Sequence, residues 1–191
     1  MTAPQKPHWV AIAAWIVSIV ALGLSTAQFR LSTQALKLNE RPWVTLQSAR
    51  TLGDALSVGS RPRLQAFFQN SGHSPALRKT IWYLVRRSDE LPRTSAFPFD
   101  WFWKENAAEY PGTASQSVMA PQGPEYIDPF LKDPLTERQV AQLQAGQIEL
   151  VIVGIVRYDD IFSQSHQTTY CYQTIHLSQD LSPCPQWNTA D

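Results

Sequence analysis

Glycine, cysteine and charged residues are all scarce in this sequence. Eight glycines in 191 residues exclude collagen-like and glycine-rich low-complexity chains. Two cysteines are too few for the disulfide framework of a small secreted domain. Charged residues make up 17% of the chain, below the ~25% that is usual for a soluble domain, and the formal net charge is zero. The chain has no overall excess of basic residues, so its composition does not indicate nucleic acid as a partner.

Motifs that hold nucleotides or present a nucleophile are also missing from the sequence. It contains no G-x-S-x-G elbow, no G-x-G-x-x-G loop and no P-loop. We interpret its two basic pairs, Arg61/Arg63 and Arg86/Arg87, as a solvated turn and a solvated strand end. The sequence therefore predicts no cofactor and no nucleic-acid partner.

The clearest feature present is a long apolar run near the start. The 23 residues between Lys6 and Arg30 carry no charge, with His8 taken as neutral. As a helix they would span about 34 Å, enough to cross a hydrocarbon core of ~30 Å. Aromatic residues stand at both ends of the run, as is typical of membrane interfaces. We predict an N-terminal flank at 1–7 and a transmembrane helix at 8–29 that contacts the lipid bilayer.

A buried helix and a signal peptide are the alternatives to a membrane anchor. A buried helix of a soluble protein is disfavoured because the run is long and apolar on every face. A cleaved signal peptide stays open, because Ser25-Thr26-Ala27 offers small residues at a spacing that signal peptidases accept.

Charge gives a first indication of orientation. Residues 1–41 carry four basic and one acidic residue, net +3, whereas residues 42–191 carry 12 and 15, net −3. Basic residues favour the cytoplasmic side, and Arg30, Lys37 and Arg41 follow the apolar run. The sequence therefore predicts a single-pass protein of the cell (inner) membrane, with a slight preference for a cytoplasmic C-terminal domain.

After the apolar run the hydrophobic period changes from helical to alternating. Residues 30–41 continue as a helical linker, which Pro42 ends because the residue before a proline avoids the α region. A second helix is predicted at 135–145, where Thr136 can cap its start. Residues 147–158 are apolar on both faces, which predicts a central strand covered on both sides. Alternation or β-branched composition predicts strands at 43–47, 63–69, 80–85, 117–119, 147–158 and 167–177.

Short strands with short connections and a single short helix indicate a mainly β domain. We predict an antiparallel β-sandwich over residues 42–180, because a parallel βαβ sheet needs more helices than the sequence offers. Residues 88–116 are expected to be largely irregular, and residues 181–191 to form an irregular tail.

Three short segments also carry a resemblance to other proteins. They are Arg41-Pro-Trp-Val44, Asn70-Ser-Gly-His-Ser-Pro-Ala76, and Gly154-Ile-Val-Arg-Tyr-Asp-Asp-Ile-Phe162 with His166 and Tyr170-Cys171. With the N-terminal run, they resemble a loose set of uncharacterised bacterial single-pass membrane proteins with a C-terminal immunoglobulin-like β domain. The resemblance implies that fold and a membrane location, and it implies no activity and no catalytic residues.

Asp159, Asp160 and His166 are the best catalytic candidates. Paired carboxylates near an imidazole can do acid–base work or bind a metal, but the same residues also suit a polar hairpin loop. The spacing of His166, Cys171 and His176 argues against zinc, because along one strand Cys171 would face away from both histidines.

The two cysteines leave two alternatives open. Cys171 and Cys184 can pair if the domain is exported, and in the cytosol they should remain thiols. On a strand, Cys171 would also serve simply as a small buried apolar residue.

The stretch from Phe97 to Trp103 is the most unusual in composition, with Phe97, Phe99, Trp101 and Trp103 at alternate positions. We expect these rings to cover an open end of the core from a kinked edge. The functional alternative is a contact patch for lipid or a protein partner.

The sequence as a whole favours a membrane-anchored, non-enzymatic β-sandwich that serves interaction or the cell envelope, with an unknown protein partner. The rival is a membrane-tethered hydrolase using Asp159, Asp160 and His166. An enzyme would need these side chains to converge in a concave pocket.

Overall fold

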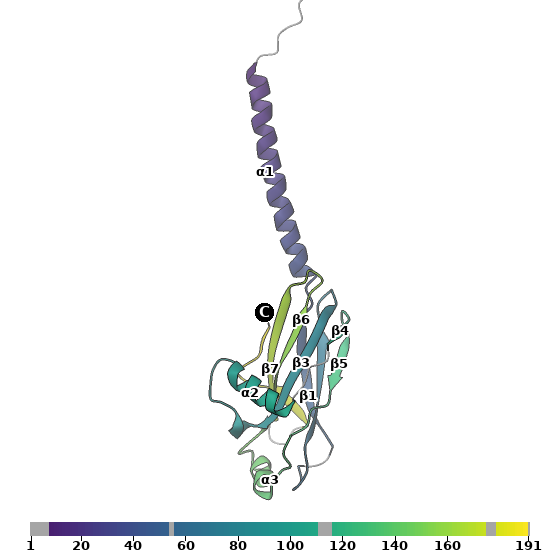
Figure 1. Cartoon of the computed structure of the whole chain (residues 1–191), viewed down its shortest axis with the longest axis vertical. Helices are drawn as coiled ribbons and strands as arrows, with labels where there is room; N and C mark the ends of the chain where they lie inside the picture. Colours follow the sequence, from purple (N-terminus) through teal and green to yellow (C-terminus); the bar gives the residue numbers. More distant parts are fainter. Residues whose placement is uncertain (1–7, 54–55, 111–115, 175–178, 191) are drawn as a thin grey trace, which may run out of the picture. The chain divides into compact units, whose positions relative to one another are not determined.

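The structure is a computed structural model that describes residues 8–53, 56–110, 116–174 and 179–190. It divides into two compact units, residues 1–40 and residues 41–191. The first is a helix and the second is a β domain (Figure 1).

The first unit is one helix, α1, from His8 to Asn39. The helix therefore continues through the predicted linker and ends before Pro42, as expected. From Ile12 onward it is long and apolar enough to cross a membrane, and none of this apolar window is buried. Its large apolar side chains, such as Trp15 and Phe29, are exposed. This exposure excludes the buried helix of a soluble core.

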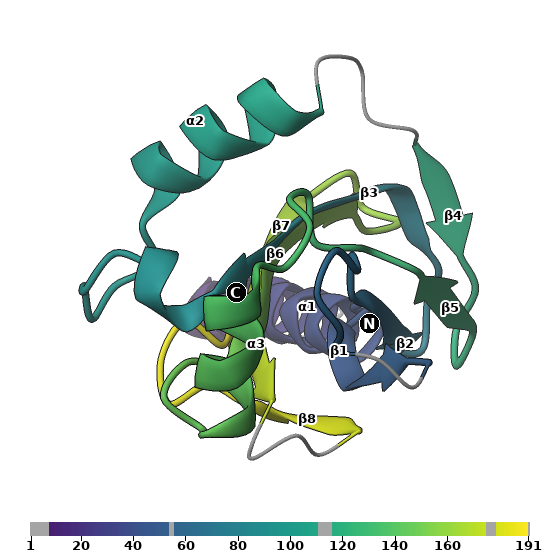
Figure 2. The ribbon, with the colours of Figure 1, turned by 90° about the horizontal axis from the view of Figure 1, so that it is seen from below.

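The second unit contains an antiparallel sheet of nine strands in the order β4-β3-β6-β7-β8-β1-β2-β5, with β9 paired to β7. The sheet is barrel-like, since its strands curl around a central core (Figure 2). The mainly β, antiparallel fold is confirmed, whereas the immunoglobulin-like sandwich is not. The strands are β1 Val44–Leu52, β2 Arg63–Asn70, β3 Ala76–Arg87, β4 Ser117–Met119, β5 Pro124–Ile127, β6 Leu150–Asp159, β7 Ser165–Thr174, β8 Asp180–Pro183 and β9 Thr189–Ala190.

The second predicted helix is also present, as α3 from Glu137 to Gln144. Thr136 caps it: its hydroxyl accepts from the backbone N–H of Gln139, and the Gln139 side chain accepts from the Thr136 N–H at 2.8 Å. This reciprocal capping box satisfies two backbone donors at the helix start.

Two predictions about irregular segments are wrong. Residues 88–116 contain a 3₁₀ turn, Ser88–Glu90, and a further helix, α2, from Phe99 to Glu109. The tail after residue 180 contains β8 and β9, which pair with β7. Their two to four residues are too short to show alternation, and they become strands through pairing, β8 with β7 and β1, and β9 with β7.

The ends of the strand order, β4 and β5, are joined in the chain by residues 120–123 and lie side by side (Figure 2). The buried Asn70 side chain ties this region together. Its Oδ1 accepts from the N–H groups of Trp43 at 3.0 Å and Gly72 at 3.1 Å. Its Nδ2 donates to the carbonyl of Ser74 at 2.8 Å and, at longer distance, to those of residues 119 and 120.

The strand β6 separates two apolar cores. Leu150, Ile152 and Val156 face the inner core, which the curled sheet encloses. The alternate side chains face an outer core, which α2 and the C-terminal segment cover. The outer core consists of Leu84, Phe102, Val151, Val153, Ile155, Cys171 and Trp187, with half-buried aromatic residues around it. The predicted central strand with two covered faces is confirmed.

Glycine is required at one position of β6. A Cβ on Gly154 would collide with the carbonyl oxygen of Trp82 and with the ring of Tyr170. The missing side chain lets Tyr170 lean across β6, where its hydroxyl donates to the Trp82 carbonyl at 3.2 Å. Burial raises the pKa of Tyr170 well above its ordinary value.

An ion pair between a buried lysine and a half-buried glutamate joins two strands that are not neighbours in the sheet. Lys79 of β3 contacts Glu125 of β5, and the Lys79 side chain is 1% exposed. Burial lowers the pKa of Lys79 from 10.5 to about 8, because desolvation disfavours its charged form.

This lowered pKa predicts a pH dependence of stability. Between about pH 8 and pH 10.5 the unfolded chain binds a proton at Lys79 that the folded domain has lost. The contribution of Lys79 to the free energy of unfolding therefore rises with pH across this window, by at most ~1.4 kcal/mol per pH unit. Denaturant unfolding of the fragment from Arg41 should show this rise relative to Lys79→Met/Glu125→Gln, in which neither partner is left unpaired. A constant difference between the two proteins across the window would contradict it.

Candidate functional site

The predicted catalytic residues do lie close together, at the turn between β6 and β7. Asp160 is buried, and its Oδ1 accepts from the N–H groups of Phe162 and Gln164, each at 2.8 Å. Its Oδ2 lies 3.1 Å from Nε2 of His166. Burial acts to raise the pKa of Asp160, but the hydrogen bonds from Gln164, His166 and Phe162 outweigh it and hold that pKa below its ordinary value. The carboxylate is thus held ionised as the acceptor of its own turn.

Asp159 has different partners. Its Oδ1 accepts from the hydroxyl of Ser165 at 2.6 Å, and its Oδ2 forms an ion pair with Arg78 of β3. The two carboxylates therefore serve separate networks and do not share a proton or a common acceptor point. This geometry favours the polar-turn interpretation over acid–base work.

A pocket of about 440 Å³ lies beside this turn. Arg78 and Trp82 of β3, Arg157 of β6 and His166 of β7 contribute to its walls. Sequence reasoning found only the Asp159 and His166 side of this pocket. Arg78 and Trp82 come from β3, which is distant in the chain from β6 and β7, and no local motif marks them. Arg157 lies in the segment 154–162 that carries the resemblance, but nothing in that segment indicates a role for it in a pocket.

The spacing of His166, Cys171 and His176 does not make a metal site. Cys171 is in a disulfide, so it offers no thiolate, and His176 lies outside the described residues. Within the described ranges no three His, Cys, Asp or Glu side chains are grouped to hold a metal ion.

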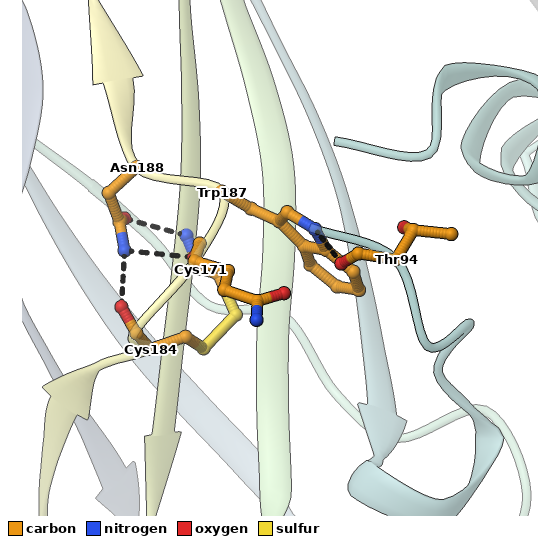
Figure 3. The surroundings of a disulfide bond; sticks show 6 residues. Thr94, Cys171, Cys184, Trp187 and Asn188 are labelled. Atoms are coloured by element: carbon orange, nitrogen blue, oxygen red, sulfur yellow. Dashed lines mark hydrogen bonds between the residues drawn. A yellow bond between two sulfur atoms is a disulfide. The ribbon is translucent and has the colours of Figure 1, made fainter. Parts of the chain in front are cut away.

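The disulfide joins Cys171 of β7 to Cys184, with their Cα atoms 5.3 Å apart. It resolves the alternatives left open for the two cysteines. Asn188 reinforces the bond by accepting from the Cys171 N–H and donating to the Cys184 carbonyl, each at 2.9 Å (Figure 3). Trp187, in the left-handed region at φ 72°, donates from Nε1 to the Thr94 carbonyl at 3.1 Å. The C-terminal segment is thereby fixed to β7 on one side and to the loop before α2 on the other.

The aromatic stretch is not the expected alternating edge. Phe97 and Pro98 precede α2, and the rings from Phe99 onward project from a helix. The helical period makes Phe102 the fully buried ring, although it stands outside the alternating set. Phe97, Trp101 and Trp103 are half-buried against the outer core, and Phe99 is 39% exposed. Pro98 signals the start of this helix, because proline is tolerated at a helix terminus.

Polar contacts also hold α2 to the sheet. Arg86 of β3 contacts Glu109 at 2.7 Å and Glu105 at 3.3 Å. Asn106 donates to the carbonyl of Tyr83 at 3.1 Å. Arg86 is buried, so its interpretation as a solvated strand end is wrong: the helix that covers it was not expected.

Comparison with known proteins does not assign the chain to a family. No family model matches the sequence, and no curated protein matches it significantly.

Substitution of Asp160 tests the role of the turn carboxylate. We expect Asp160→Ala to lower the free energy of unfolding by about 1–3 kcal/mol, because two partly buried N–H groups lose their charged acceptor. Asp160→Asn keeps Oδ1 in place and should cost much less. Denaturant unfolding of both variants measures the difference. If neither variant lowers the free energy of unfolding measurably, Asp160 does not stabilise the turn, and a catalytic role for it would again be open.

The two phenylalanines of α2 form a matched pair of variants. Phe102→Ala should cost ~3–5 kcal/mol, because it empties a fully enclosed position of the outer core. Phe99→Ala should cost under ~1 kcal/mol, because that ring is already partly in solvent. Thermal or denaturant unfolding compares them, and losses of the same size would mean that α2 does not pack as described.

Proposed function

We propose that the protein is a single-pass anchor of the cell (inner) membrane that displays its β domain on the non-cytoplasmic side and acts there by binding. The observation that carries this proposal is the disulfide between Cys171 and Cys184 in a domain that follows an apolar, unburied helix. Its bacterial setting and its immunoglobulin-like character rest on the sequence resemblance alone.

Retention of the anchor is supported by the course of α1. The helix runs through Ser25–Ala27 without a break to Asn39. The hydroxyls of Ser25 and Thr26 donate hydrogen bonds to backbone carbonyls of the preceding turn, at 2.8 and 2.9 Å. A continuous helix offers no extended backbone to a signal peptidase. Its exposed apolar side chains need lipid around them, since water disfavours so large an apolar surface.

Redox chemistry supports the non-cytoplasmic side for the β domain. Cytosolic reductants keep thiols reduced, whereas disulfides persist in exported domains. The charge count around α1 favours the opposite orientation, but its margin is about one residue. The pairing of Cys171 with Cys184 also completes the cover of the outer core, so the packing of the folded domain includes the two cysteines in their oxidised, disulfide-bonded form. We therefore place the β domain in the oxidising compartment.

Binding is favoured over hydrolysis by how the candidate catalytic groups are used. Asp160 serves the backbone of its own turn, and Asp159 is engaged by Arg78 and Ser165. The pocket beside them is lined by arginine and tryptophan side chains, which are residue types that often carry binding energy.

Reporter fusions test this proposal in a bacterial host. Alkaline phosphatase is active only after export, and a green fluorescent protein fluoresces only when it stays in the cytoplasm. With either reporter fused after Asp191, we expect active phosphatase, no fluorescence, and retention of the protein in carbonate-washed membranes. The control begins at Arg41 and should give inactive phosphatase, because it lacks α1. Fluorescence of the full-length fusion, or its release by carbonate, would overturn the proposal.

A further inference from the structure

The pocket beside the β6–β7 turn lies on the outer face of the sheet. Thr80, Arg157 and Gln167 are in register across β3, β6 and β7. Arg157 stands two residues beyond Ile155 of the outer core, so strand alternation places it on the same face. The pocket volume of about 440 Å³ lies in the range of small-molecule sites.

Arg157 is held in place by its neighbours. Its guanidinium carbon lies 5.1 Å from the ring centre of Trp103 and 5.8 Å from that of Trp82. Its Nε donates to the Gln167 side chain at 2.8 Å. Among the residues that the structure describes, none accepts from its Nη1 or Nη2 groups. The two tryptophan rings and the hydrogen bond from Nε therefore orient the guanidinium. Its Nη1 and Nη2 donors are left for a ligand.

A second arginine reaches the pocket through an irregularity of β3. The register of β3 against β6 shifts between Leu77 and Thr80, and Arg78 has a φ of 46°. The left-handed region costs a non-glycine residue about 1 kcal/mol or more, and such strain often marks functional positions. The bulge brings Arg78 to Asp159 at the pocket wall. With two arginines and one aspartate, the charged groups of the lining leave one positive charge in excess, with His166 taken as neutral.

We propose that this pocket binds a small ligand through a carboxylate or phosphate group, which Arg157 holds with its two Nη donors beside Trp82. A planar guanidinium matches both oxyanions in a bidentate manner, and the excess positive charge favours them. This inference deepens the proposed function by naming a ligand class, and it rests on the claim that the domain acts by binding.

Calorimetric titration of the full chain in phosphatidylcholine nanodiscs tests the inference. The probes are inorganic phosphate, D-glucuronate and, as the uncharged counterpart, D-glucose. We expect saturable binding of at least one oxyanion and none of glucose. Binding of phosphate alone, of glucuronate alone or of both supports the site and defines which oxyanion it prefers. No saturable binding of either would overturn it.

Variants then assign the binding to the pocket. Arg157→Gln should weaken it roughly tenfold or more, and Arg157→Lys should also weaken it, because lysine keeps the charge and loses the fork. Arg61→Gln removes an exposed arginine that does not line the pocket and should leave the affinity unchanged. If circular dichroism shows that Arg157→Gln is unfolded, Arg78→Gln takes its place with the same expectation of weaker binding.

Equal affinity in the wild type and in the folded pocket variant would overturn the site. The orientation of the chain in the membrane does not enter this titration. Failure of the pocket and failure of the proposed location are therefore separate results.

Discussion

The burial of both faces of β6 is the constraint on which the domain depends. A strand with apolar side chains on both sides needs two covering layers, because either face left in water would forfeit its hydrophobic stabilisation. The curled sheet supplies one layer, with Leu150, Ile152 and Val156 inside it. The other face, with Val151, Val153 and Ile155, lies outside the sheet and needs a separate cover.

The cover of this outer face comes from two segments that are distant in the chain. It is assembled from α2, through Phe102, and from the C-terminal segment, through Trp187. The C-terminal segment is held to β7 by the pairing of β8 and β9 and by the disulfide between Cys171 and Cys184. The outer core thus includes a disulfide, a bond typical of exported domains, and the same face carries the pocket around Arg157.

The sequence predicted most features with a strong local period and missed those that depend on tertiary pairing. The two-faced pattern of β6 and the capping by Thr136 were both visible in the chain. The helix α2 was missed because its rings at alternate positions imitate a strand, and β8 and β9 because they are too short to show a period. The turn at Asp160 was recognised as a site of polar contacts, but Arg78, Trp82 and Arg157 meet only through strand register, which one sequence does not specify.

We propose that the membrane-bound chain keeps its anchor and that its β domain carries the disulfide. The most direct test is the intact mass of the protein purified from membranes and treated with a thiol-alkylating reagent, before and after reduction. The account predicts a chain that retains α1, with no alkylated cysteine before reduction and two after it. Alkylation without reduction, or a chain that begins after Ala27, would contradict the account.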